Sequence, residues 1–164
     1  MKQLRTRNGV SLLELIVTIT ILGILAAGVM PLIRNTTIRT KEIELRRNLR
    51  IIRIAIDDFK KTYDKVPAGI GKPMNKSGYP ETLQVLVEGH DFQDSAKPGE
   101  VKFLRRPVLN PLDPKSSEDK EQWGWGLRSY EDKYDSTNWG KQDVFDVYAP
   151  QDGTALDGTK YNEW

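Results

Sequence analysis

The sequence contains no cysteine and one histidine, His90. Without cysteine the chain can have no disulfide, no zinc site built on thiolates and no thiol nucleophile. His90 lies in a polar stretch without spaced metal ligands or triad partners, so we expect it at the surface. The glycines are scattered and do not form a phosphate-binding loop. These absences remove the sequence signals of several enzyme classes, and we predict that the chain is not an enzyme.

A strong net charge is also missing. The 25 Lys and Arg residues nearly balance the 23 Asp and Glu residues, so the formal net charge is +2. Nucleic-acid-binding domains are strongly basic, and we therefore expect no nucleic-acid partner. A length of 164 residues fits about one domain. A small exported domain without disulfides needs another means of stabilisation, such as a metal ion or neighbours in a filament.

Charge is almost absent from residues 10–33, where Glu14 is the single charged residue. About 20 apolar residues suffice for a helix to span a membrane. A charge within such a helix costs about 2.5–3.5 kcal/mol or more unless it has a partner. We therefore interpret residues 10–33 as a membrane-spanning helix and expect Glu14 to have a partner.

Two simpler interpretations of this segment exist. One is a secretory signal peptide cleaved after the small residues around Ala27, and the other is a plain signal anchor. A cleaved signal is disfavoured because nothing would offset the cost of Glu14 inside its apolar region. The helical pattern also continues beyond Ala27.

The residues around the start of the apolar segment form a motif. A short basic leader ends at a glycine, and an apolar segment with one early glutamate follows. The residues concerned are Lys2, Arg5, Arg7, Gly9, Leu12, Leu13 and Glu14. This pattern resembles the N-terminus of type IV pilins and of the pseudopilins of type II secretion. Val10 stands where that family usually has Phe, and Ser11 stands where Thr is common.

The resemblance implies a processing step and an assembly step. A prepilin peptidase would remove residues 1–9, the leader, by cutting after Gly9, and Val10 would then be N-methylated. Residues 10–33 would serve first as a membrane anchor and then as the core of a filament. In the filament, Glu14 would pair with the Val10 amine of a neighbouring subunit. Alternatively, Glu14 assists peptidase recognition or merely favours the N-terminus of a helix.

Residues 34–63 have the pattern of an amphipathic helix. Apolar residues recur at spacings of three and four, which indicates one buried face. They are Leu45, Leu49, Ile52, Ile56, Phe59 and Tyr63, and the face is widened by Ile51, Ile54 and Ala55. We predict one helix from Val10 to about Tyr63, with its second half packed against the C-terminal domain.

The same helix has an excess of basic residues. Nine Lys or Arg residues and four Asp or Glu residues lie between Arg34 and Lys61. The simplest interpretation is a solvated helix face. A functional interpretation is contact with lipid headgroups or with acidic patches on neighbouring subunits.

Two stretches rich in glycine, proline or polar residues, 65–78 and 89–99, are predicted to be loops. Between them, residues 81–88 have the pattern of a short helix. Pro80 precedes this helix and Gly89 is a candidate for its C-cap.

The remainder of the C-terminal domain, which comprises residues 64–164, is predicted to contain two strands. Bulky and small residues alternate at 123–130, and a second apolar run follows at 143–148. The polar segment between them fits a long hairpin loop. Trp123 and Trp125 are two positions apart, and we expect both to face the core.

These elements together predict an α+β fold. It is pilin-like, with a long N-terminal α-helix that is transmembrane in its first half and amphipathic in its second. This helix would pack on a small antiparallel β-sheet, with a short extra helix and a loop-rich C-terminal tail. The layout is similar to that of the major pseudopilin of type II secretion.

The resemblance also implies a possible calcium site. Major pseudopilins bind calcium in the loop after the last strands, and Asp152 and Asp157 occupy that region here. Calcium takes six to eight oxygen ligands, many of them carboxylates. Asp-Gly pairs are also ordinary turn formers, and no EF-hand spacing is present.

The implied function is that of a structural subunit of a type II secretion pseudopilus, which helps to export folded proteins across the outer membrane. The chain would be a single-pass inner-membrane protein with a periplasmic C-terminal domain. Its partners would be the membrane, further copies in a helical filament, other pseudopilins, the prepilin peptidase and the inner-membrane secretion platform. One alternative is a type IV pilin for motility, adhesion or DNA uptake. Another is a membrane-anchored periplasmic binding domain that never polymerises.

Overall fold

The computed structural model describes residues 9–66, 77–93 and 99–164, and the side chains of residues 28–35 are outside this description. Three sequence-based predictions therefore fall wholly or partly outside the described residues. They concern the basic leader up to residue 8, most of the loop at 65–78, and the middle of the loop at 89–99.

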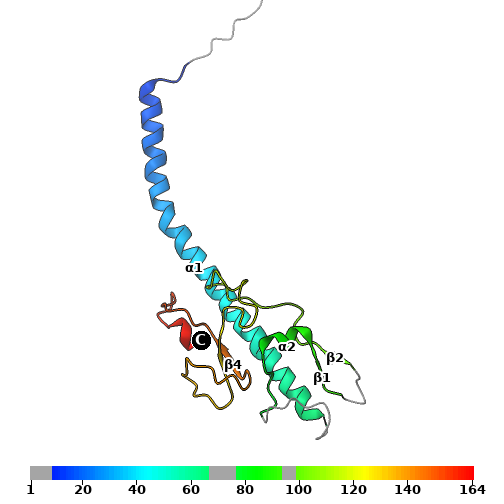
Figure 1. The fold of residues 1–164 in the computed structure, drawn as a ribbon. Coiled ribbons are helices and arrows are strands. Elements are labelled where there is room, and N and C mark those ends of the chain that lie inside the picture. Colours follow the sequence, from blue (N-terminus) through cyan, green and yellow to red (C-terminus); the bar gives the residue numbers. More distant parts are fainter. Residues whose placement is uncertain (1–8, 67–76, 94–98) are drawn as a thin grey trace, which may run out of the picture. The chain divides into compact units, whose positions relative to one another are not determined.

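The longest element is helix α1, which comprises Leu12–Lys65 and confirms the prediction of one long N-terminal helix (Figure 1). Glu14 lies in its first turn and Lys65 in its last turn. These charges are at the ends of the helix where the macrodipole favours them. The chain divides into two compact units, Met1–Arg39 and Thr40–Trp164, and α1 contributes to both. We call them the N-terminal unit and the C-terminal unit.

The core of the C-terminal unit is built on one face of α1. Leu45, Leu49, Ile52, Ile56 and Phe59 each expose 2% or less of their surface, as their spacing predicted. Ala55 is also buried, whereas Tyr63 and Ile51 are partly buried against the core.

The prediction that Ile54 widens this face is wrong, because Ile54 is 51% exposed. Each residue advances about 100° around an α-helix. Ile54 therefore lies about 200° from Ile52, on the solvent side.

Helix α2 comprises Leu83–Glu88 and confirms the predicted short helix. Gly89 ends it with a φ of 103°, a value that favours glycine, and its N–H donates to the Val85 carbonyl. Leu83 and Leu86 are fully buried.

The strands form two small antiparallel pairs. Strand β1 (His90–Asp91) pairs with β2 (Glu100–Val101), and β3 (Gly126–Arg128) pairs with β4 (Asp146–Tyr148). The β3–β4 pair confirms the predicted hairpin, with Leu127 opposite Val147. Strand β1 lies where a loop was predicted, and β2 begins directly after that predicted loop. These two strands have two residues each, which is too short for an alternating pattern to be visible.

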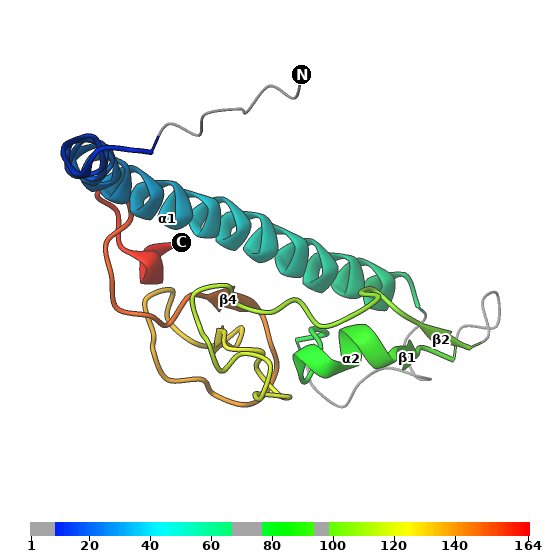
Figure 2. The same ribbon diagram turned by 90° about the horizontal axis from the view of Figure 1, so that it is seen from above.

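His90 is half-buried rather than fully exposed at the surface. Its ring lies 5.6 Å from that of Phe59 and 4.7 Å from that of Phe92, between ring centroids. This aromatic contact holds β1 near the C-terminal end of α1, and Figure 2 shows α2, β1 and β2 beside that part of the helix.

Trp123 and Trp125 are buried as expected, each with 1% of its surface exposed. The Trp125 indole N–H donates to the Val108 carbonyl over 2.7 Å. Trp123 lies outside the strand that was predicted to begin there, because β3 begins only at Gly126. The Asp119 carboxylate accepts hydrogen bonds from the backbone N–H groups of Gln122 and Gly124 and so holds this stretch in a turn.

Candidate functional site

The predicted cleavage position precedes helix α1. Gly9 and Val10 are exposed and lie outside the helix, which begins at Leu12. The first backbone hydrogen bond is donated by the Leu15 N–H to the Ser11 carbonyl over 3.1 Å. An exposed, non-helical peptide is the form in which proteolytic cleavage is favoured. The backbone at Gly9 and Val10 therefore has the exposed, non-helical form that the predicted cleavage needs.

Glu14 is exposed in the first turn of α1. The two threonine side chains of the same segment are satisfied within the helix. The Thr18 hydroxyl donates to the Leu15 carbonyl over 2.9 Å, and the Thr20 hydroxyl donates to the Ile16 carbonyl over 2.7 Å. Glu14 is the charged group of this apolar segment, and we expect its partner to come from outside its own helix.

The N-terminal unit exposes an unusual amount of apolar surface. Eleven large apolar side chains before residue 26 are each 47% exposed or more. They are Val10, Leu12, Leu13, Leu15, Ile16, Val17, Ile19, Ile21, Leu22, Ile24 and Leu25. Burying such side chains is favourable by about 1.5–3 kcal/mol each, or on the order of 20 kcal/mol together. Among the residues whose side chains are described, no helix is both long and apolar enough to cross a membrane.

A second candidate site is the C-terminal tail, residues 149–164, which is held on α1 by charged side chains. Glu42 is 7% exposed. Its carboxylate accepts hydrogen bonds from the Tyr161 hydroxyl over 3.0 Å and from the Leu156 N–H over 2.9 Å. Burial raises the pKa of Tyr161, and the hydrogen bond to Glu42 raises it further. The phenol therefore stays protonated and keeps donating to Glu42.

Arg46, one turn further along α1, binds the tail at two points. It forms an ion pair with Asp157, and its guanidinium lies 3.9 Å from the centroid of the Trp164 ring. Asp157 also accepts hydrogen bonds from the hydroxyl and the N–H of Thr159, over 2.6 Å and 3.0 Å. These hydrogen bonds, together with Arg46, lower the pKa of Asp157 to about 2.

Arg53 completes the set by joining the tail to β4. Its Nε donates to Asp146 over 2.7 Å, and its Nη2 donates to the carbonyls of Val147 and Trp164 over 2.9 Å and 3.0 Å. We call Glu42, Arg46 and Arg53 the tail clamp. These residues fasten the C-terminal tail without a disulfide, and sequence analysis had not singled them out.

Asp152 and Asp157, the two aspartates predicted to bind calcium, differ in their surroundings. Asp152 is exposed, and both carboxylate oxygens of Asp157 already accept from donors of the chain itself. In the described part of the chain, no three Asp, Glu, His or Cys residues are grouped as metal ligands. Calcium binding at Asp152 and Asp157 stays a prediction, and it would require Asp157 to exchange Arg46 for the cation.

A long N-terminal helix with one early glutamate, packed on a small antiparallel sheet, defines the pilin-like class of α+β proteins. Comparison with known families finds the prokaryotic N-terminal methylation motif at residues 4–30, which includes Gly9, Val10 and Glu14. Comparison with known proteins finds the type II secretion system core protein G of Pseudomonas aeruginosa. The two are 30% identical over 106 residues, which cover 56% of this chain and 75% of that protein.

The chain therefore belongs to the pilin-like pseudopilin family that includes type II secretion system core protein G. This confirms the family resemblance drawn from the leader, Gly9 and Glu14. No solved structure matches the chain.

Proposed function

We propose that the chain is a structural subunit of a type II secretion pseudopilus rather than an enzyme. The observation that carries this proposal is the exposed apolar surface of residues 10–25, among which Glu14 is the one charged residue. Such a surface needs lipid or other apolar helices around it. A subunit that is first held in a membrane and then packed into a filament provides both environments in turn.

In this proposal the chain has four functional parts. Residues 1–9 are a leader, 10–33 anchor the subunit and later form the filament core, 34–63 continue the helix, and 64–164 form a periplasmic domain. Val10 becomes the N-methylated first residue, and Glu14 pairs with that amine in a neighbouring subunit. The partners are other pseudopilins, the prepilin peptidase and the inner-membrane secretion platform.

The first test is the processing of the leader. We expect protein isolated from membranes to begin at N-methylated Val10 and to retain the whole apolar helix. An intact mass measurement decides this. A Gly9→Val variant is expected to keep its leader, because cleavage in this family depends chiefly on that glycine. Gly23→Ala is the matched control and should be processed normally, since a Cβ at Gly23 meets nothing within 4 Å.

Two masses would contradict the proposal. A chain that begins near residue 29 would indicate a cleaved secretory signal, and a chain that retains Met1 would indicate a plain anchor. Electron microscopy of cells with this chain as sole copy separates a polymerising subunit from a solitary anchored domain. Loss of secretion, as opposed to loss of motility or DNA uptake, on deletion of the gene separates a pseudopilin from a type IV pilin.

We also propose that calcium binds the C-terminal tail at Asp152 and Asp157. There it would compete with Arg46 of the tail clamp for Asp157. Calcium at a hundredfold excess over Kd would stabilise the folded chain by about 2.7 kcal/mol. The expected result is a higher melting temperature of the full-length protein in calcium than in chelator. The shift should grow in Arg46→Ala, which frees the Oδ2 of Asp157, and should vanish in Asp157→Asn. Asp135→Asn, an exposed change in another loop, is the control. Equal melting temperatures in calcium and chelator for both wild type and Arg46→Ala would exclude the site.

A further inference from the structure

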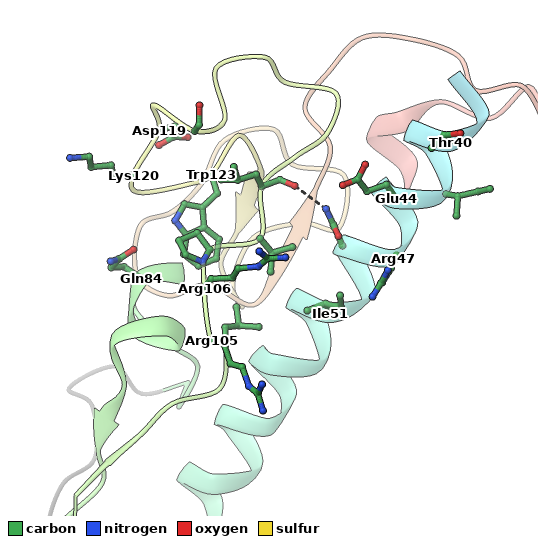
Figure 3. A pocket seen from close by; sticks show the side chains of 17 residues that line it. Thr40, Glu44, Arg47, Ile51, Gln84, Arg105, Arg106, Asp119, Lys120 and Trp123 are labelled. Atoms are coloured by element: carbon green, nitrogen blue, oxygen red, sulfur yellow. Dashed lines mark hydrogen bonds between the residues drawn. The ribbon is translucent and has the colours of Figure 1, made fainter. Parts of the chain in front are cut away.

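The C-terminal unit has a groove of about 1090 Å³ between α1 and the segment that follows β2. Figure 3 shows Arg47 and Glu44 on the helix side and Arg105, Arg106 and Trp123 on the other. The Asn48 side chain donates to the Leu109 carbonyl over 3.0 Å and ties the two walls together. The groove is therefore part of the folded unit.

The groove is basic. Arg47, Arg105, Arg106 and Lys120 line it and are exposed. None of these four forms an ion pair with any residue that the structure describes. Two carboxylates, Glu44 and Asp119, also line the groove. The Asp119 carboxylate already accepts hydrogen bonds from backbone N–H groups. The four basic side chains of the groove therefore outnumber the carboxylates of the groove that are available to pair with them.

Apolar side chains lie among these cations. Ile43 is 63% exposed and Leu109 is 38% exposed, and both line the groove. Arginine next to exposed apolar surface is typical of protein–protein interfaces, in which aromatic side chains are also enriched. The chemistry of the groove therefore fits an acidic segment that carries an aromatic residue.

The chain itself presents such a segment, residues 130–135, which we call the acidic loop. Tyr134 is 88% exposed, the highest value among the large hydrophobic side chains of the described residues. Glu131 and Asp135 are exposed on either side of it. With Asp132 and Lys133, the loop has three acidic residues and one basic residue.

The acidic loop is held in shape by its own contacts. The Asp132 carboxylate accepts hydrogen bonds from the N–H groups of Ser129 and Gly140, over 2.7 Å and 3.0 Å. These bonds lower the pKa of Asp132, so its carboxylate stays ionised. Tyr130 stacks on Tyr79 with ring centroids 5.8 Å apart. A loop fixed in advance loses less conformational freedom on binding than a flexible one.

We propose that the basic groove of one subunit binds the acidic loop of a second copy of this chain, head to tail. The two surfaces share no residue. The two surfaces also lie at different positions along α1. The groove extends to Ile51. The acidic loop lies near Lys60, because its Tyr130 packs on Tyr79, and Tyr79 faces Lys60. Nine helical residues, about 14 Å, separate Ile51 from Lys60.

Each copy carries one groove and one loop. A copy that is bound through its groove therefore still presents its loop to a further copy. A head-to-tail contact of this kind repeats into an open, helical assembly. Complementary charges chiefly give such a contact its specificity and its rate of association. This inference rests on the proposed filament function and adds to it a contact between C-terminal units.

The absence of cysteine makes the contact testable by cross-linking. Leu109→Cys and Tyr134→Cys are made separately in the full-length chain, expressed in membranes and treated with a short thiol cross-linker. Mixed expression of the two variants is expected to give a dimer, each variant alone should give none, and the double variant should give a ladder of multimers. Ile54→Cys, which is exposed outside the groove, replaces Leu109→Cys in the control and should give no dimer with Tyr134→Cys.

Charge reversal tests the recognition itself. Arg105→Glu with Arg106→Glu is expected to reduce the mixed cross-link about tenfold, and Glu131→Lys with Asp135→Lys on the partner should restore it. Lys115→Glu, an exposed change outside the groove, should have no effect.

Three outcomes would overturn the inference. They are normal filaments without any mixed cross-link, a dimer formed by Tyr134→Cys alone, and a cross-linked product whose mass shows a different protein. The first leaves the proposed filament function intact, so the failure of the inference is distinguishable from the failure of that function. Retention of the leader in the mass measurement would instead contradict the function.

Discussion

Replacing Glu42 by Ala is expected to release the C-terminal tail from α1 and to destabilise the C-terminal unit by about 2–4 kcal/mol. The carboxylate is buried and accepts from the Tyr161 hydroxyl and the Leu156 N–H. Removing it leaves the buried Tyr161 hydroxyl and the partly buried Leu156 N–H without an acceptor. A buried donor without an acceptor costs about 1–3 kcal/mol. Thermal melting of the full-length protein measures the loss, and limited proteolysis should cut within the tail first.

The matched control for this change is Glu44→Ala, two positions further along the same helix. Glu44 is exposed, so its removal should change stability by less than about 0.5 kcal/mol. Tyr161→Phe removes the hydroxyl itself, so no donor is left there without an acceptor. It should therefore destabilise the C-terminal unit less than Glu42→Ala does. Equal melting temperatures for Glu42→Ala and Glu44→Ala would contradict the clamp.

The parts of the fold that follow from local pattern could be predicted from the sequence. The buried face of α1 repeats with the period of a helix, and α2 is bounded by Pro80 and Gly89, so both were found. Ile54 was misplaced because a wide apolar face was assumed where a narrow one exists. The β1–β2 pair was missed because its strands are too short to show any period.

The residues of the candidate sites also differ in whether the sequence could predict them. Gly9, Val10 and Glu14 lie within a few residues of one another, and a short motif is enough to find them. The tail clamp was missed because its partners lie between 93 and 119 positions away along the chain. Its residues resemble ordinary solvated charges in the sequence. Their spacing of four and seven, along the edge of the buried face, is the one local signal that links them.

Replacing Glu14 by Leu is expected to abolish filament assembly while leaving insertion and cleavage intact. The change makes the apolar segment more apolar, so insertion into the membrane should not suffer. The bond between Gly9 and Val10 lies outside the helix and is unaffected. What the variant loses is the carboxylate that would meet the Val10 amine of its neighbour.

The size of the effect follows from the cost of an unpaired charge in an apolar environment. Each charge costs about 2.5–3.5 kcal/mol or more, and pairing removes much of both penalties. With Glu14 gone, the amine of every subunit stays unpaired, and each contact weakens by about 3 kcal/mol, which is roughly a hundredfold in its equilibrium constant. Because the loss recurs at every subunit, a filament of such copies should not form.

The experiment uses the Glu14→Leu chain as sole copy and compares intact mass, filaments by electron microscopy, and secretion. Glu14→Asp, which keeps the charge on a shorter side chain, is the control and should retain part of the assembly. Normal filaments from Glu14→Leu would refute the pairing. A retained leader would instead assign Glu14 to recognition by the peptidase. We expect correct cleavage without filaments, because Glu14 is an exposed carboxylate in the first turn of an apolar helix.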